Sequence, residues 1–173
     1  METLFTLDKK DYSPDMPIQE RHAVRGIIER DGKFIMQQSK EGDFKIPGGG
    51  IEPGETHVQA LAREVREEVG LLVIPESVRP IGEIVEKRRD IFDPTRTYIA
   101  HSYFYVCDVG EQSVEPQMTE SELRLGYHPV WEDLEQIIET NDRFLNQDWQ
   151  KRDHLFMRWM RDRREKRIEL KAE

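Results

Sequence analysis

The sequence has little of several features that mark particular protein classes. It contains a single cysteine, Cys107, so no disulfide can form within the chain, and a disulfide-stapled fold is excluded. No apolar run approaches the roughly 20 residues that a membrane-spanning helix needs. The opening METLFTLDKKDYSPDMP lacks a basic segment followed by an apolar stretch, the pattern of a secretory signal. We therefore expect no membrane partner and a cytoplasmic location.

Positive charge is scarce relative to negative charge. Lys and Arg number 26 against 35 Asp and Glu, which gives a formal net charge of −9 at pH 7. This balance argues against a general nucleic-acid binder. It would also repel polyphosphates, so an enzyme for such substrates needs metal cations or local Arg and Lys clusters at its site.

The length of 173 residues suits one domain with a sizeable core. We therefore treat residues 1–173 as a single domain, with residues 1–20 as an N-terminal arm or edge strand and residues 147–173 as a C-terminal helix. An Asp-Gly pair at residues 31–32, between two apolar segments, indicates a hairpin. Strands on both sides of a central helix predict an α/β (α+β) sandwich with a mixed sheet. The other expected elements are strands at residues 22–28, 33–38, 44–46, 71–74, 81–86, 98–109 and 127–131, a helix at 132–140 and a polar loop at 110–122.

The most informative segment is the central helix, predicted over residues 56–69 and stopped by Gly70. At about 100° per residue, Glu67 and Glu68 lie within about 60° of Glu64, and the apolar side chains centre about 120° away. Crowded carboxylates repel one another, and a bound hard divalent cation such as Mg²⁺ offsets that repulsion. Taken alone, this stripe of three carboxylates (Glu64, Glu67 and Glu68) is either a metal site or an acidic face exposed to solvent.

The residues around the helix carry a more specific pattern. Nine of them follow the order G-x5-E-x7-R-E-U-x-E-E-x-G-U, where U is aliphatic: Gly49, Glu55, Arg63, Glu64, Val65, Glu67, Glu68, Gly70 and Leu71. This segment resembles the signature of the Nudix (MutT-like) hydrolase family at every position. Residues 44–50 resemble the strand and glycine loop that precede it, and the likeness extends over about residues 21–140. It implies an α/β/α sandwich with a catalytic helix after a Gly-rich loop.

The resemblance also implies a reaction. Nudix hydrolases cleave nucleoside diphosphates linked to another group X, by attack of water on a phosphorus atom with the help of Mg²⁺ or Mn²⁺. By position, Glu64, Glu67 and Glu68 match the carboxylate metal ligands of the family, and the carbonyl of Gly48 matches a backbone ligand. The expected substrate is therefore a small-molecule nucleotide or nucleotide-sugar.

Two further roles follow from the same resemblance. Arg63 and Glu55 match the pair that holds the glycine loop against the helix and orients Glu64. The general base is either a glutamate of the signature or one from a later loop, and Glu120 or Glu122 stands about where that loop is expected. Both are otherwise ordinary loop acids.

The substrate-binding residues rest on position along the chain. Arg25 and Lys45 lie on strands that lead to the site, where either can contact phosphate. Phe44 is a candidate for stacking on a base, as is the aromatic run 103–105, although aromatic residues in strands are usually core. The five histidines show no metal-ligand spacing, so none is assigned a role. Further candidates for phosphate contact are Arg88, Arg89 and Arg96.

Alternatives to a small-molecule hydrolase remain open at this stage. One is a non-enzymatic nucleotide sensor built on the same fold. Another is an RNA cap hydrolase, because the C-terminal segment is rich in basic residues, although acidic residues interrupt them and favour a solvated face with ion pairs. A homodimer through the aromatic residues of this segment is also open. Its basic residues are Arg158, Arg161, Arg163, Arg164, Lys166 and Arg167.

Overall fold

The centre of the molecule is a mixed four-stranded sheet in the order β1-β7-β8-β2. Strand β1 (Thr3–Asp8) runs parallel to β7 (Arg79–Arg89), and β2 (Ile18–Ile27) runs parallel to β8 (Thr97–Val106). Strands β7 and β8 are antiparallel to each other. The mixed sheet predicted from the sequence is therefore confirmed.

Two smaller antiparallel sheets accompany the central one. Strand β4 (Lys33–Gln38) pairs along its whole length with β10 (His128–Asp133). It also pairs with two short strands, with β3 (Glu29–Arg30) at its start and with β5 (Phe44–Lys45) at its end. The β3–β4 hairpin turns at residues 31–32, as the Asp-Gly pair predicts. The remaining pair consists of β6 (Leu71–Val73) and β9 (Val109–Ser113).

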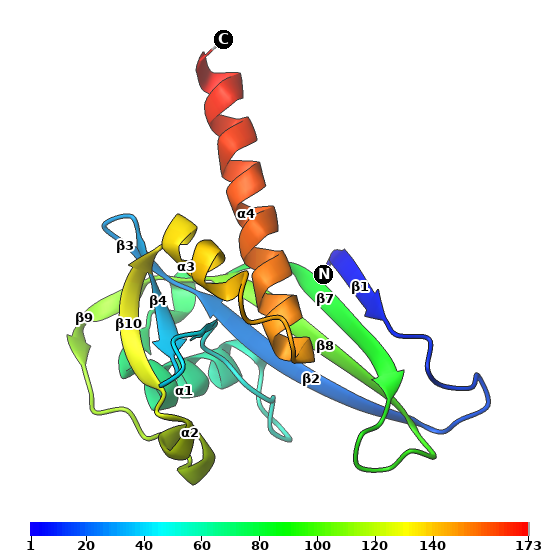
Figure 1. The fold of residues 1–173 in the computed structure, drawn as a ribbon. Helices are drawn as coiled ribbons and strands as arrows, with labels where there is room; N and C mark the ends of the chain where they lie inside the picture. Colours follow the sequence, from blue (N-terminus) through cyan, green and yellow to red (C-terminus); the bar gives the residue numbers. More distant parts are fainter. Residues whose placement is uncertain (173) are drawn as a thin grey trace.

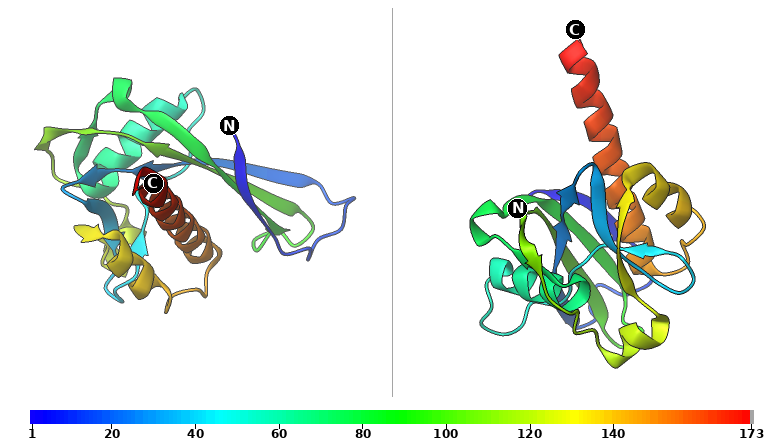
Figure 2. Two further views of the ribbon diagram at one scale, coloured as in Figure 1. Left: turned by 90° about the horizontal axis from the view of Figure 1, so that it is seen from above. Right: turned by 90° about the vertical axis from the view of Figure 1, so that its left-hand side faces the viewer.

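Helices cover both faces of the central sheet (Figures 1 and 2). Helix α1 lies against one face, and α4 crosses the opposite face with its first turns before its later turns project away from the body. The helices are α1 (His57–Val69), α2 (Glu120–Leu125), α3 (Leu134–Asn141) and α4 (Asp148–Ala172), with a short 3-10 turn η1 (Pro75–Ser77).

The core has one apolar cluster on each face of the central sheet, because side chains alternate between the faces along a strand. On the α4 face, Phe104 stacks on Phe156 with ring centroids 3.9 Å apart. On the α1 face, Val24 packs with Leu61 and Val65 of the helix, and all three are fully buried. This burial fixes α1 against the sheet and leaves its polar stripe for other contacts.

Two predicted boundaries are wrong. The expected strand at residues 98–109 is broken near Cys107, so residues 98–106 belong to β8 and β9 begins at Val109. The expected polar loop at residues 110–122 instead contains β9 and the start of α2. The sequence carried a signal for α2: Thr119 and Glu122 form a capping box, and Gly126 ends the helix in the left-handed conformation.

The structure is a computed structural model that describes the backbone of residues 1–172 and the side chains up to Lys166. Within that part, α4 confirms the predicted C-terminal helix; Glu173 and the side chain of Arg167 lie outside the described residues. No helix among the described residues is both long enough and apolar enough to cross a membrane. The predicted N-terminal arm is the edge strand β1.

Candidate active site

Helix α1 is fixed at both ends by local interactions. Thr56 caps the N-terminus by accepting a hydrogen bond from the backbone N–H of Gln59, whose side chain accepts one from the Thr56 N–H in return. Gly70 ends the helix with φ 70°, a conformation that glycine adopts without strain. These caps set where the helix begins and ends, and the burial of its apolar side chains against the sheet turns its carboxylates toward the preceding glycine loop.

The glycine loop runs along the outer edge of β2. The Val24 N–H donates to the Gly49 carbonyl at 2.9 Å, and the Gly26 N–H donates to the Pro47 carbonyl at 2.8 Å. Gly48 has φ 139°, and a Cβ added there would lie 2.0 Å from the Val24 carbonyl oxygen. A Cβ on Gly49 would lie 2.5 Å from a carboxylate oxygen of Glu64. Only glycine fits at position 48, whereas a side chain at position 49 would displace the Glu64 carboxylate.

Arg63 joins the loop to the helix. Its Nε and Nη2 donate to the two carboxylate oxygens of Glu55 at 2.7 and 2.9 Å, and Nη2 also donates to the Gly50 carbonyl at 2.9 Å. Its Nη1 donates to Glu64 Oε1 at 2.7 Å and lies 3.4 Å from Glu67 Oε2. The hydrogen bonds to Arg63 lower the pKa of Glu55 to about 2. One guanidinium group therefore positions two of the three stripe carboxylates.

Glu68 is the most enclosed carboxylate of the stripe, with 3% of its surface exposed. Its Oε2 accepts a hydrogen bond from the Gly48 N–H at 2.6 Å, and its Oε1 lies 3.1 Å from Lys45 Nζ. Burial raises the pKa of Glu68 to about 6, even though Lys45 and the Gly48 N–H act in the opposite direction. The protonation state of this group therefore changes close to neutral pH.

The donor set of the site suits a hard cation. It offers the carboxylates of Glu64, Glu67 and Glu68 and the carbonyl of Gly48, and oxygen donors of this kind are what Mg²⁺ and Mn²⁺ accept. In the part of the chain with described side chains, no three acidic, histidine or cysteine groups converge closely enough to enclose an ion. The reason is visible in the contacts, because Glu64 turns toward Arg63 and Glu68 toward Lys45.

The two candidate loop acids differ in position. Glu122 Oε1 lies 3.8 Å from Lys45 Nζ, which itself contacts Glu68. Burial works to raise the pKa of Glu122, but hydrogen bonds from Thr119 and the charge of Lys45 outweigh it and lower that pKa. Glu120 is exposed at the start of α2. Of the two acids, the structure brings Glu122 to the stripe.

Arg25 lies on β2, next to the glycine loop. It is 6% exposed, and its Nη1 donates to the Gly48 carbonyl. Burial and the nearby charge of Arg152 lower the pKa of Arg25 to about 10, so it stays cationic at neutral pH. Lys45 lies on the other side of the loop, with its Nζ 5.5 Å from the centre of the Tyr127 ring. Both predicted cations therefore border the Gly48 region.

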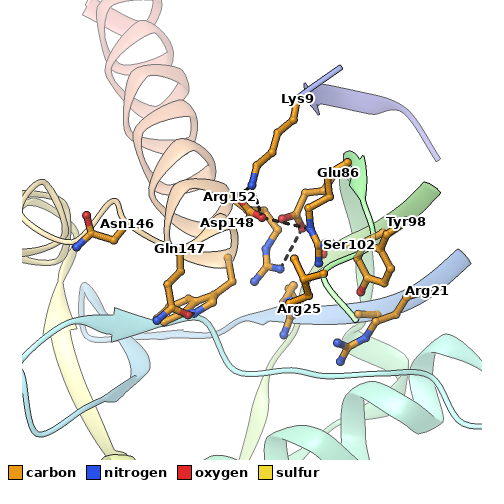
Figure 3. A pocket seen from close by; sticks show the side chains of 15 residues that line it. Lys9, Arg21, Arg25, Glu86, Tyr98, Ser102, Asn146, Gln147, Asp148 and Arg152 are labelled. Carbon is orange, nitrogen blue, oxygen red and sulfur yellow. Dashed lines mark hydrogen bonds and ion pairs between the residues drawn. The ribbon is translucent and has the colours of Figure 1, made fainter. Parts of the chain in front are cut away.

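A cavity of about 370 Å³ opens on the α4 side of Arg25. It lies between β2, β7, β8 and the N-terminal turns of α4, as Figure 3 shows. Arg88, a weaker candidate in the sequence, lines it, whereas Arg89 bonds to Asp11 and Arg96 to Asp93 outside it. Its charged lining residues are Lys9, Arg21, Arg25, Arg88, Arg152, Glu86 and Asp148.

Phe44 does not occupy the position expected of a base-stacking residue. Its side chain is 2% exposed and packs in the core cluster on the α4 face of the sheet. Its backbone is held by Asn141, which accepts from the Phe44 N–H at 2.9 Å and donates to the Phe44 carbonyl at 2.8 Å. The Ile46 N–H donates to Asp153 at 3.0 Å. Side chains of α3 and α4 thus replace a neighbouring strand along the segment that enters the loop.

Strands β2 and β8 bring together a row of histidine and tyrosine rings that the sequence spacing did not indicate. The ring of His22 stacks on His101 at 4.9 Å and on Tyr103 at 5.9 Å. His57 Nδ1, at the start of α1, lies 2.7 Å from the Tyr105 hydroxyl. The pairing of β2 with β8, 79 positions away at His22 and His101, creates this row, so only the strand register could have revealed it.

The basic residues of α4 engage acids of the same chain. Arg164 contacts Glu29 at 2.5 Å, and Arg161 lies 3.7 Å from Glu135. Arg158 lies 3.6 Å from Asp142. These contacts match the solvated, ion-paired face that the interrupting acids indicated. The aromatic residues of the helix pack inward, as Phe156 does against Phe104.

Comparisons with known proteins agree with this geometry. The NUDIX domain family model matches residues 20–169. Over 72 residues the chain is 46% identical to an ADP-ribose pyrophosphatase of Methanocaldococcus jannaschii, covering 39% of this chain and 41% of that protein. Over 53 residues it is 45% identical to the CTP pyrophosphohydrolase of Escherichia coli, covering 28% and 39%. Over 79 residues it is 37% identical to the human 8-oxo-dGDP phosphatase NUDT18, covering 40% and 24%.

The matched segments span less than half of each of these relatives. Among solved structures, a NUDIX hydrolase from Nitrosomonas europaea superposes with a TM-score of 0.56 at 19% identity, over 78% of this chain and 85% of that one. A MutT structure from work on Aliivibrio salmonicida and Vibrio cholerae gives 0.51 at 17% identity, over 80% and 97%. At these identities the likeness establishes a shared fold.

Proposed function

The chain belongs to the Nudix family, and from this premise we propose that it is a metal-dependent pyrophosphohydrolase. The proposed reaction is cleavage of a nucleoside diphosphate linked to another group X, by attack of water on a phosphorus atom. The relatives support the bond type, since they are named for pyrophosphatase, pyrophosphohydrolase and phosphatase activities on different nucleotides. The substrate class is therefore proposed as a nucleotide or nucleotide-sugar.

One observation carries this proposal, namely the close fit between the glycine loop and the carboxylate stripe. Gly49 approaches the Glu64 carboxylate so closely that a Cβ there would displace the carboxylate, and Gly48 binds Glu68 through its N–H. Arg63 ties the same loop to Glu64 and Glu55. An acidic helix that served only to be solvated would not need a backbone held against its carboxylates at this distance.

In the proposed mechanism, Glu64, Glu67 and Glu68 with the Gly48 carbonyl would hold the divalent cations. Such ions polarise phosphoryl oxygens and lower the pKa of a bound water. The protein supplies the positions: Arg63 fixes the orientation of Glu64, and the Gly48 N–H fixes Glu68. Positioning and charge stabilisation of this kind account for most of the catalysis of phosphoryl transfer.

We assign the general base to Glu122, with Glu120 as the alternative. Glu122 lies near Glu68 through their shared neighbour Lys45, and its carboxylate is ionised at neutral pH and can accept a proton, although its lowered pKa makes it a weaker base than an exposed glutamate. Arg25 and Lys45 flank the Gly48 region and can neutralise the charge of a diphosphate there. The roles proposed for Glu122 and for the two cations rest on their positions next to the carboxylates of α1.

The test is a panel of nucleoside diphosphate derivatives with Mg²⁺ or Mn²⁺, analysed for phosphate-containing products. We expect hydrolysis of at least one of them, loss of activity with EDTA, and recovery when the metal is restored. Saturable binding of nucleotides without turnover of any compound would favour the sensor alternative instead. Preferential hydrolysis of capped RNA over small nucleotides would favour the RNA alternative, which the ion pairs along α4 do not support.

A further inference from the structure

The cavity beside Arg25 has a charge opposite to that of the protein as a whole. Five cationic side chains line it, against two carboxylates, in a chain with a formal net charge of −9. The five come from different elements: Arg21 and Arg25 from β2, Arg88 from β7, Arg152 from α4, and Lys9 from the segment after β1. An excess of positive charge converging from four parts of the fold indicates a site for an anion.

Two of these cations are buried, and each has a polar atom without a hydrogen-bond partner. Arg25 and Arg152 are 6% and 4% exposed. Within the described side chains, Arg25 Nε has no hydrogen-bond partner, and Arg152 Nη2 makes no hydrogen bond but lies 2.8 Å from Asp153 Oδ1 in an ion pair. Buried N–H groups are nearly always paired in folded proteins, so Arg25 Nε points to an acceptor that the described residues do not supply.

The two guanidinium groups also repel each other. The charge of Arg152 is, after burial, the largest influence that lowers the pKa of Arg25. Glu86 and Asp153 compensate Arg152 with contacts of 3.3 and 2.8 Å, but Arg25 contacts only the neutral Gly48 carbonyl. An anion bound between the two groups would remove this repulsion and supply the missing acceptors.

The remaining cations stand closer to the mouth of the cavity. Arg21 is exposed on β2, and Arg88 stacks over the Tyr98 ring at 4.3 Å while its Nε lies 3.3 Å from Asp148. Lys9 contacts the same Asp148 at 2.8 Å. A single carboxylate therefore meets two cations at the entrance, which leaves positive charge available to a ligand that enters (Figure 3).

The cavity is adjacent to the proposed reaction centre. Arg25 donates to the carbonyl of Gly48, and the N–H of Gly48 donates to Glu68. A substrate whose diphosphate lies at the carboxylate stripe can therefore reach the cavity with the part that is not cleaved. We propose that this cavity binds an additional phosphoryl group of the substrate, separate from the scissile diphosphate. The inference rests on the proposed function and narrows its substrate class to phosphorylated nucleoside diphosphate derivatives.

A phosphoryl group fits this lining better than a neutral sugar or a base. Its three terminal oxygens can accept from several guanidinium groups at once, and Arg binds such groups in a bidentate manner. A neutral ligand would leave the buried charge of Arg25 without a compensating contact, at a cost in binding free energy.

The experiment compares matched substrates that differ by one phosphoryl group. The pairs are NADPH and NADH, coenzyme A and dephospho-coenzyme A, and 2′-phospho-ADP-ribose and ADP-ribose, each assayed with Mg²⁺. We expect the phosphorylated member of at least one pair to have a kcat/KM about tenfold higher or more, since one good charged contact is worth about that factor. Ratios at or below one in all three pairs would overturn the proposal.

Variants then tie the preference to the cavity. Arg88→Gln and Arg21→Gln change residues near its mouth, where the fold depends on them least, and each should reduce the ratio within the preferred pair severalfold. Arg79→Gln is the matched control, because Arg79 stands at the opposite end of β7 from Arg88 and should leave the ratio unchanged. An equal fall for both members of the pair in Arg88→Gln and Arg21→Gln would mean a general field effect and would contradict a phosphoryl subsite.

A second measurement separates this proposal from the proposed function. Binding of inorganic tripolyphosphate is measured by calorimetry in EDTA, without turnover. Binding that weakens in Arg88→Gln and Arg21→Gln, but not in Arg79→Gln, supports the anion site even if no compound is hydrolysed. If the protein hydrolyses nucleotides but binds tripolyphosphate equally in all variants, the hydrolase assignment stands and the cavity assignment is wrong. A wild-type preference for UDP-glucuronate over UDP-glucose that exceeds every phosphoryl preference would also overturn it, in favour of a carboxylate.

Discussion

Arg63 and Glu55 form a bidentate ion pair, with Nε and Nη2 of the arginine 2.7 and 2.9 Å from the two carboxylate oxygens. The pair leaves Nη1 of Arg63 directed at Glu64, 2.7 Å away. Glu55 therefore acts on the carboxylate stripe through the arginine, as a positioning residue. This relationship was expected from the sequence resemblance, and the structure adds the Gly50 carbonyl as a further acceptor for Arg63.

Glu55→Gln should weaken the apparent affinity for Mg²⁺ by about 10 to 100-fold, the usual range for residues that orient metal ligands. An amide can accept only one of the two hydrogen bonds, so Arg63 loses its fixed orientation. Metal titrations of the activity measure this change. Glu52→Gln, in the same exposed turn, is the control and should titrate as the wild type does. A shift in maximal rate with unchanged metal dependence would contradict this role.

The three stripe carboxylates should be individually indispensable. Glu64→Gln, Glu67→Gln and Glu68→Gln should each lower kcat by about a hundredfold or more, which is the typical effect of removing one group that stabilises charge in the transition state. Glu111→Gln, an exposed acid on β9, should have a near-normal rate. Steady-state kinetics give kcat for each variant, and circular dichroism verifies that each variant is folded. Near-normal rates for Glu67→Gln and Glu68→Gln together would remove them from the mechanism.

Asn141→Leu should lower both stability and activity. The variant leaves the N–H and carbonyl of buried Phe44 without partners, which costs about 1 to 3 kcal/mol of unfolding free energy for each unpaired group. The segment that enters the glycine loop then loses its support on α3. Urea denaturation and kcat are measured together, with Glu139→Leu, an exposed change on the same helix, as the control. Full activity at unchanged stability would show that β5 needs no such support.

The buried carboxyl of Glu68 should make the metal-free protein less stable as the pH rises. Burial raises its pKa to about 6, so the folded chain binds this proton more tightly than the unfolded chain, whose value is 4.5. The contribution, about 2 kcal/mol, is fully present below pH 4.5 and is lost as the pH rises through about 6. Thermal unfolding in EDTA, compared between the wild type and Glu68→Gln across this range, should show the wild type losing stability relative to the variant. Parallel curves would indicate that Glu68 titrates normally.

Local signals were sufficient to predict the catalytic helix. Thr56 and Gly70 mark its ends in the sequence, and the spacing of Glu64 and Glu68 already places them on one face. The fold class and the hairpin at residues 31–32 were predictable for the same reason. Helix α2 had an equally local signal in its capping box, so its omission was a failure to use information that the sequence contained.

The cavity and the support of the loop could not be predicted in this way. Arg25 and Arg152 meet only because β2 and α4 pack against each other, although 127 positions separate them. The contact of Ile46 with Asp153 spans 107 positions. No short-range periodicity encodes contacts of this length, since they depend on the way in which whole elements pack. The same holds for the ring of His22, which meets His101 through strand pairing.

The hydrogen bonds that Asn141 and Asp153 make with the segment before the glycine loop also have a consequence for biosynthesis. A ribosome releases the signature helix long before it has translated Asn141 and Asp153, the residues that hold Phe44 and Ile46. A nascent chain that has emerged only as far as β6 therefore carries all nine signature residues while their loop still lacks its anchors. The proposed hydrolysis should therefore begin only after Asp153 has emerged, because the signature residues before that point lack the contacts that hold their loop.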